Sequence, residues 1–136
     1  MADSIELPAP VPSVNPETKP FWDATAEGRL VLKRCTACRE VIWYPRAMCP
    51  ECGSMDTEWF DASGRGTVYS FTINYRGDGP YRSSPYVLAY VELEEGPRMM
   101  TNIIGTDPSQ VSIGQPVKVV FEPTGEGPAL PRFQPA

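Results

Sequence analysis

The sequence contains no histidine among its 136 residues. A Ser-His-Asp or Cys-His relay within this chain is therefore excluded, and the side chain that most often transfers protons near neutral pH is missing. Catalysis by the chain alone would need carboxylates, Lys or Tyr, and the candidates are Asp78 and the pair Glu94 and Glu95. Two adjacent acids beside a glycine are more simply explained as a solvated turn, so we expect no catalytic residue in this chain.

Basic residues and long apolar runs are also scarce. The chain has 12 Lys and Arg against 17 Asp and Glu, a net charge of −5, and this charge disfavours general binding of nucleic acids. The longest apolar run, residues 87–91, has the length of a strand, whereas a bilayer requires roughly 20 apolar residues. The first residues carry acids where a signal peptide carries basic residues, so we expect a cytoplasmic protein.

The 16 prolines gather toward the two ends of the chain. Residues 1–14 alternate proline with small or apolar residues, which predicts an extended arm. Residues 17–28 predict a short helix, with Thr18 as N-cap, Pro20 in the first turn and Gly28 as the C-terminal stop. Such a short helix is marginal by itself, so its apolar residues must dock on the rest of the chain or on another protein.

From about residue 29 onward, segments rich in β-branched and aromatic residues are separated by turn signals, which predicts strands rather than helices. The expected strands cover residues 29–34, 41–44, 57–60, 67–75, 86–93, 98–104 and 116–122, with a short last strand near 130–133. The later strands fit a small barrel or sandwich. We predict a mostly β fold in three parts: an arm and short helix in residues 1–28, a cysteine-containing ribbon in 29–62, and the barrel or sandwich in 63–136.

The strongest signal is two Cys-x-x-Cys motifs, Cys35 with Cys38 and Cys49 with Cys52, separated by ten residues. A two-residue gap lets both thiolates of a motif reach one metal ion, and a tetrahedral zinc ion needs four such ligands. We therefore predict a structural zinc ion on these cysteines. Four thiolates leave no position for water or substrate, so the metal is not expected to catalyse a reaction.

Three alternative roles for the four cysteines stay open. A rubredoxin-type iron centre uses the same ligand set. Two redox-active dithiols are a second alternative, although thioredoxin-type motifs lie at a step from strand to helix and neither motif here does. Structural disulfides are the third, and a cytoplasmic location disfavours them.

Basic residues cluster around the first cysteine motif, where Glu40 is the one acid between residues 29 and 46. The cluster consists of Arg29, Lys33, Arg34, Arg39 and Arg46. These residues either compensate the negative charge of a metal bound by four thiolates or form a site for phosphates or for an acidic partner. The sequence does not separate these two roles.

Outside the cysteines, a series of short motifs extends from about residue 19 to residue 133. They are Phe21-Trp-Asp, Gly28-Arg-Leu, Tyr44-Pro-Arg46, residues 64–72, Pro85-Tyr-Val87, Val91-Glu-Leu and Ile113-Gly-Gln-Pro-Val117. In this order, the motifs resemble the zinc-ribbon and OB-fold proteins of acyl-CoA metabolism known as the domain of unknown function thirty-five family. The resemblance implies a short N-terminal helical region, a rubredoxin-like zinc ribbon and a C-terminal OB-fold barrel. Residues 42–44 depart from the family pattern, in which an aromatic residue is followed by two prolines, and this difference affects the ribbon hairpin rather than the metal ligands.

Members of this family are usually small non-catalytic subunits of thiolase-like enzymes, among them thiolases and the aldolases of steroid side-chain degradation. The resemblance therefore implies an accessory subunit that binds a thiolase-like or aldolase protein and helps to shape the channel for its CoA thioester. Such a subunit needs exposed aromatic and arginine side chains, the types enriched at interfaces. The candidate interface residues are Phe21, Trp22, Trp43, Tyr44, Arg76, Tyr81 and Arg82.

A second hypothesis is that the barrel binds single-stranded nucleic acid. Tyr69, Phe71 and Tyr75 have the same strand parity, so we expect them on one face, where they could stack on bases. A place inside the barrel is the simpler explanation of these aromatics, because one parity of every strand lines a barrel interior. Trp59 and Phe60 are expected to seal the contacts between helix, ribbon and barrel.

Overall fold

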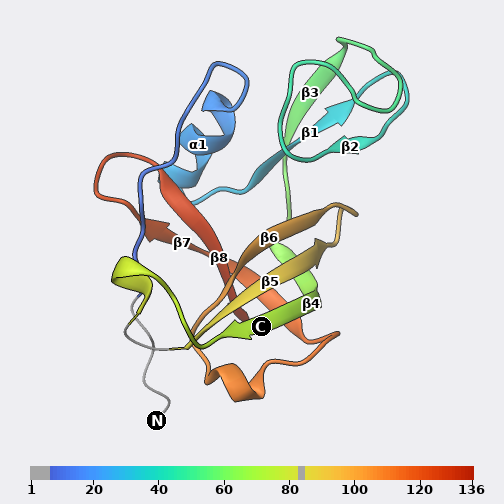
Figure 1. Ribbon diagram of the computed structural model, residues 1–136. Coiled ribbons are helices and arrows are strands. Elements are labelled where there is room, and N and C mark those ends of the chain that lie inside the picture. Colours follow the sequence, from blue (N-terminus) through green and yellow to red (C-terminus); the bar gives the residue numbers. More distant parts are fainter. Residues whose placement is uncertain (1–6, 83–84) are drawn as a thin grey trace.

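A computed structural model describes residues 7–82 and 85–136 of the chain. It has one α-helix and a three-stranded sheet at one end and a closed five-stranded barrel at the other (Figure 1). The mostly β fold with a single short helix agrees with the sequence prediction. Among the described residues, no helix is long and apolar enough to cross a membrane.

Helix α1 spans Lys19–Ala26 and packs one face on the rest of the protein. Thr18 occupies the N-cap position as predicted, but its side chain does not cap the helix. Its hydroxyl donates instead to the carbonyl of Asn15 (3.4 Å). The helix ends before Gly28, whose φ of 75° is the left-handed conformation that glycine adopts most readily. The Thr25 hydroxyl oxygen accepts a hydrogen bond from the amide of Ala129 (3.1 Å), which ties the helix to the last strand.

The ribbon is a small antiparallel sheet in the order β2-β1-β3. Strand β1 covers Val31–Cys35, β2 covers Val41–Ile42 and β3 covers Thr57–Asp61. The predicted strand at residues 41–44 is thus only half as long as expected. Trp59 and Phe60 are half-buried and pack against the hydrophobic core, which agrees with the predicted sealing role.

The barrel closes in the order β4-β5-β6-β8-β7. Its strands are β4 (Arg65–Asn74), β5 (Tyr86–Leu93), β6 (Arg98–Ile103), β7 (Pro116–Pro123) and β8 (Ala129–Pro135). Two short 3-10 turns, η1 at Gly79–Tyr81 and η2 at Pro108–Gln110, lie in the connecting segments. Neighbouring strands are antiparallel except for β6 and β8, which are parallel and meet at the single pair Ile103 and Phe133.

One hydrophobic core joins the barrel interior to the helix and the ribbon. Its fully buried side chains include Phe21, Leu32, Val68, Val91, Met99 and Phe133. Phe21 has no exposed area, so the prediction that it lies on an accessible interface is wrong. A helix this short needs a large apolar side chain to anchor it on the rest of the protein. Phe21 serves as this anchor and is therefore not available to a partner.

The prediction that Tyr69, Phe71 and Tyr75 share one face is also wrong. A β-bulge between Val68 and Ser70 adds one residue to β4, so the strand parity reverses at that point. As a result Phe71 packs against the core, whereas Tyr69 is 46% exposed. Tyr75 follows the last residue of β4, Asn74, and is 71% exposed. The interior position expected for all three aromatics therefore applies to Phe71 alone.

The N-terminal arm is described from residue 7 onward, and residues 1–6 of the predicted arm lie outside the described residues. Residues 7–14 form no helix or strand and run along the side of the barrel (Figure 1). The carbonyl of Pro8 accepts a hydrogen bond from the guanidinium of Arg132 on β8. The described part of the arm is thereby attached to the barrel.

Candidate functional site

The two cysteine motifs form two knuckles with the same backbone geometry. In the first knuckle the amide of Cys35 donates to the carbonyl of Glu40, and the amide of Arg39 donates to the carbonyl of Cys35, both at 2.9 Å. In the second knuckle the amides of Cys49 and Gly53 make the equivalent bonds, also at 2.9 Å. The two knuckles are therefore matching turns that share the same pattern of backbone hydrogen bonds.

Each knuckle needs a left-handed residue directly after its second cysteine. Gly53 fills this position in the second knuckle with φ of 78°, and Arg39 fills it in the first with φ of 67°. The left-handed conformation suits glycine but is strained for a side chain with a Cβ atom. The first knuckle thus keeps its geometry at some conformational cost.

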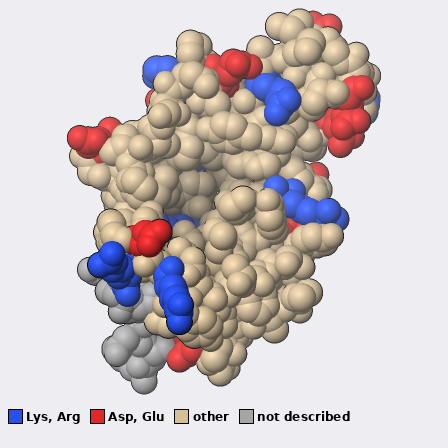
Figure 2. All heavy atoms as spheres, viewed as in Figure 1, with Lys and Arg blue, Asp and Glu red and all other residues tan. Residues whose placement is uncertain are grey.

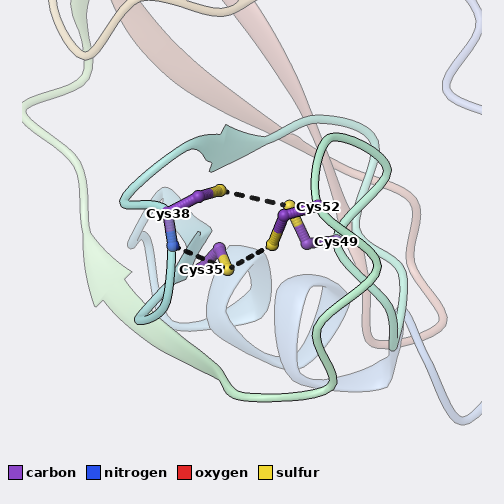
Figure 3. Close-up of side chains that lie close together, drawn as sticks. All are labelled: Cys35, Cys38, Cys49 and Cys52. Carbon is purple, nitrogen blue, oxygen red and sulfur yellow. Dashed lines mark hydrogen bonds between the residues drawn. The ribbon is translucent and has the colours of Figure 1, made fainter.

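The four sulfur atoms converge in the space between the knuckles (Figure 3). The Cys35 sulfur lies 3.5 Å from that of Cys52, the Cys38 sulfur lies 3.6 Å from that of Cys49, and all four lie within 4.8 Å of one another. Metal–sulfur bonds of about 2.3 Å in a tetrahedron place their sulfurs about 3.8 Å apart. The four donors therefore fit a tetrahedral metal ion, and the predicted ligand set is brought together.

The environment of the sulfurs shifts their pKa values in opposite directions. The amide of Cys38, which donates to the Cys35 sulfur at 3.4 Å, is the main cause that lowers the pKa of Cys35 to about 6. The amide of Glu40 lowers the pKa of Cys38, but burial and the neighbouring thiols outweigh it and raise that pKa to about 12. Four sulfurs this close can all ionise only if a cation shares the space.

The metal site is closed toward the protein and open toward solvent on one side. Cys35 and Cys49 are fully buried together with Ile42, whereas Cys38 and Cys52 are exposed. Since all four ligand positions are occupied by sulfur, the arrangement suits a structural metal and provides no open coordination position for chemistry.

Basic residues near the first knuckle are partly engaged on the ribbon surface. The guanidinium of Arg34 lies 4.0 Å from the ring centre of Phe60, and the ammonium of Lys33 lies 5.1 Å from that of Trp59. Arg29 forms exposed ion pairs with acids at the end of α1 and on β3. These contacts support the ribbon surface, and they favour neither charge compensation nor an anion site as the role of the basic cluster.

The remaining predicted interface residues fall into two groups. Trp22 is 8% exposed, Trp43 is half-buried and Tyr44 is 39% exposed, and the indole N–H of Trp22 donates to the Tyr44 hydroxyl (2.9 Å). In the loop after β4, Arg76 and Arg82 are exposed and Tyr81 is half-buried. Residues 83–84 of this loop lie outside the described residues.

Sequence reasoning missed an apolar surface on the outside of the barrel. This surface, here called the outer sheet face, consists of Tyr69 on β4, Leu88 and Tyr90 on β5, and Met100 on β6, and these side chains are between 38% and 55% exposed. Tyr90 pairs with Met100 in the sheet. The signal was present in residues 86–91, where both strand parities are apolar although a barrel interior requires only one.

Two family models match the chain in sequence. The rubredoxin-like zinc ribbon domain of ChsH2 matches residues 22–58, and the C-terminal OB-fold domain of ChsH2 matches residues 59–122. Among solved structures, a chain of the Ltp2-ChsH2(DUF35) aldolase is 37% identical, with a TM-score of 0.83, over 92% of this chain and 98% of that chain.

Curated relatives have several names. A probable enoyl-CoA hydratase alpha subunit of Thermomonospora curvata is 38% identical over 93% of this chain. A DUF35 domain-containing scaffold protein of Methanothermobacter thermautotrophicus is 38% identical over 68% of this chain and 71% of its own length. The benzoylsuccinyl-CoA thiolase subunit BbsA of Thauera aromatica is 31% identical over 69% of this chain and 72% of its own. The chain spans only 40% of the length of the Thermomonospora protein.

Proposed function

Because the chain belongs to the DUF35 family of zinc-ribbon and OB-fold proteins, we propose that it is a non-catalytic accessory subunit of a thiolase-like acyl-CoA enzyme. In this proposal the partner carries the catalytic residues and acts on a CoA thioester by carbon–carbon bond chemistry. The accessory subunit stabilises the partner and helps to shape the channel for the thioester.

The likeness to a chain of the Ltp2-ChsH2(DUF35) aldolase is the observation that carries the proposal. The two chains share 37% of their residues over almost their entire lengths, so the likeness covers the ribbon, the barrel and their relative arrangement. The name of the BbsA relative, a thiolase subunit, supports a thiolase-like partner.

The outer sheet face supplies the surface for such a partner. Exposed apolar patches on a small protein commonly mark protein–protein contacts. The charged neighbours of this face are Arg98 and Glu92, which pair with each other at 3.1 Å, and Arg98 also stacks on the ring of Tyr69 at 3.8 Å. Figure 2 shows uncharged side chains over most of the barrel in this view.

This surface favours a protein over nucleic acid as the partner. Binding of single strands requires a positively charged groove beside the stacking aromatics. On the outer sheet face the aromatics Tyr69 and Tyr90 are exposed, but the neighbouring Arg98 is already paired with Glu92. We therefore keep single-stranded nucleic acid as the less favoured alternative.

The proposed metal is zinc, held by Cys35, Cys38, Cys49 and Cys52, with iron as the alternative. Bound zinc would join the two knuckles and stabilise a ribbon that is too small for a sufficient core of its own. Four free thiols at this spacing also suit a reducing compartment such as the cytoplasm. Elemental analysis of the purified protein separates the two metals, and a colourless sample is expected because zinc has no d–d or redox transitions.

Co-expression with the thiolase-like protein of the same genome tests the proposed function. Size-exclusion chromatography with light scattering should show one complex that contains both chains. Leu88→Lys places a charge in the outer sheet face and should weaken the complex about 30-fold, as expected for loss of roughly 2 kcal/mol at an interface. Ile113→Lys is the matched control, because Ile113 is a 71% exposed aliphatic residue outside this face.

A complex that tolerates Leu88→Lys as well as it tolerates Ile113→Lys would move the docking surface away from the outer sheet face. The next residues to substitute would then be the remaining predicted interface residues that are at least partly exposed, Trp43, Tyr44, Arg76, Tyr81 and Arg82. The absence of any complex, with both chains folded, would contradict the proposed function itself.

A further inference from the structure

A cleft of about 320 Å³ separates the helix and the ribbon from the barrel. Its walls include Trp22, Trp43 and Tyr44 on one side, and Met100, Leu130 and Arg132 on the other. Figure 2 shows the molecule hollowed between these two parts. The volume lies at the lower end of the range of about 300–1,000 Å³ typical for small-molecule sites.

Strands β6 and β8 of the closed barrel line the barrel side of the cleft. These two strands share the single pair Ile103 and Phe133, and toward the cleft they are linked by the Thr101 hydroxyl, which donates to the Pro131 carbonyl at 2.9 Å. Proline has no amide hydrogen, so Pro131 cannot donate a ladder bond across this gap. Pro131 therefore keeps β6 and β8 from forming a further backbone hydrogen bond at the floor of the cleft.

Arg132 is the unusual residue of this floor. Its side chain is only 4% exposed, and it forms no ion pair among the described residues. One of its guanidinium nitrogens donates to the carbonyl of Pro8, which leaves most of its five N–H donors for other acceptors. Burial lowers the pKa of Arg132, and the charge of Glu122 opposes this effect. Within the described part of the chain, Glu122 is a nearby counter-charge but forms no ion pair with Arg132, so an anion that bonds the guanidinium directly would offset more of the cost of its burial.

The rest of the lining is mostly apolar and carries no negative charge. None of the lining residues is acidic, although the whole chain carries a net charge of −5. The Tyr44 hydroxyl accepts the hydrogen bond from Trp22, so its own proton remains free to donate toward a ligand. The cleft therefore complements an apolar molecule with one negatively charged end.

We propose that this cleft binds a small carboxylic acid, with the carboxylate at Arg132 and the hydrocarbon chain along Trp43 and Met100. Arginine binds a carboxylate through two parallel hydrogen bonds, and the aromatic and methionine side chains cover the chain of the acid. This inference goes beyond the accessory function. It applies to the isolated chain and does not require that the chain docks on a partner.

Tryptophan fluorescence of the full-length, metal-loaded chain tests the proposal. The Trp59→Phe background leaves Trp22 and Trp43, both in the cleft, as the only tryptophan emitters. Titration with octanoate should shift the emission to shorter wavelength as the hydrocarbon displaces water from the indoles. Each methylene removed from the acid should weaken binding about fourfold, so hexanoate should bind about 15-fold more weakly than octanoate.

Charge is tested with ligands of the same length. Octanoate should bind at least tenfold more tightly than 1-octanol, because a hydrogen bond to a charged group adds about that factor, and octylammonium should bind more weakly still. Arg132→Gln should abolish the preference for octanoate over octanol, whereas Arg98→Gln, an arginine on β6 outside the cleft, should leave it unchanged.

Met100→Ala takes the place of Arg132→Gln if circular dichroism shows that the arginine variant does not fold. The change removes a 55% exposed side chain from the cleft wall and should weaken every ligand by a similar factor. Equal affinities for octanoate and octanol, an unchanged emission spectrum, an unchanged preference in folded Arg132→Gln, or unchanged affinities in Met100→Ala would each overturn the proposal.

Discussion

Replacement of Phe21 by alanine tests how the helix is held on the ribbon. The Phe21 ring is fully buried and meets the rings of Trp22, Trp43 and Tyr44 edge to face, at centroid distances of 4.9, 5.3 and 6.1 Å. Loss of a buried phenylalanine typically costs about 3–5 kcal/mol. For a small domain whose total stability is about 5–15 kcal/mol, this is a large share.

The conservative change Phe21→Leu separates volume from aromatic contacts. Leucine keeps most of the apolar volume but loses the three edge contacts, so we expect a destabilisation of about 1–2 kcal/mol. Tyr44→Phe removes only the hydroxyl that accepts from Trp22 and should cost about 1 kcal/mol. The expected order of destabilisation is therefore Phe21→Ala, then Phe21→Leu, then Tyr44→Phe.

Urea unfolding of the metal-loaded proteins, followed by circular dichroism, measures these values. The midpoint should fall while the slope stays constant, because the surface exposed on unfolding is nearly unchanged. A cost below about 0.5 kcal/mol for Phe21→Ala would be that of a surface residue. It would refute the assignment of Phe21 to the core and restore it as an interface candidate.

Three further substitutions or measurements test the ribbon and the barrel. Arg39→Gly should stabilise the protein by about 1 kcal/mol, since glycine relieves the left-handed strain of the first knuckle. Urea unfolding measures the increase in the free energy of unfolding. A decrease would show that the Arg39 side chain is needed for stability. Metal uptake at pH 7 should release at least two protons, because the pKa values of both Cys38 and Cys52 are raised and their thiols must ionise to bind. A pH indicator in weak buffer measures the protons released. Metal uptake without proton release would argue against binding by all four thiolates. Gly66→Ala should destabilise the barrel by about 1–3 kcal/mol, because its Cβ would collide with the carbonyl oxygen of Glu92; an unchanged melting temperature would mean that β4 and β5 are not held this closely.

The sequence predicted the elements that depend on local pattern. Strand β5 covers the predicted residues 86–93, because its apolar run is bounded by clear turn residues. The four cysteines were predicted as one cluster, because a two-residue gap constrains the backbone of each knuckle regardless of the rest of the fold. The short helix was found near its predicted place, since Pro20 and Gly28 mark its two ends.

Features that depend on long-range packing were not predictable in the same way. The bulge at Tyr69 reverses the parity of β4, and no local residue type announces it. The sequence left open whether Phe21 docks on the rest of the chain or on another protein, because a short helix alone does not show what covers it. Arg132 gave no signal in sequence, because its burial arises from the arm at Pro8, more than a hundred residues away.

Native mass spectrometry of this chain, co-expressed with the thiolase-like protein of the same genome, tests the central claim most directly. It reads the partner and the metal in one spectrum. The account predicts a hetero-oligomer in which every copy of this chain carries one zinc ion. A folded chain that travels alone and without metal, beside an intact and active thiolase-like protein, would contradict it.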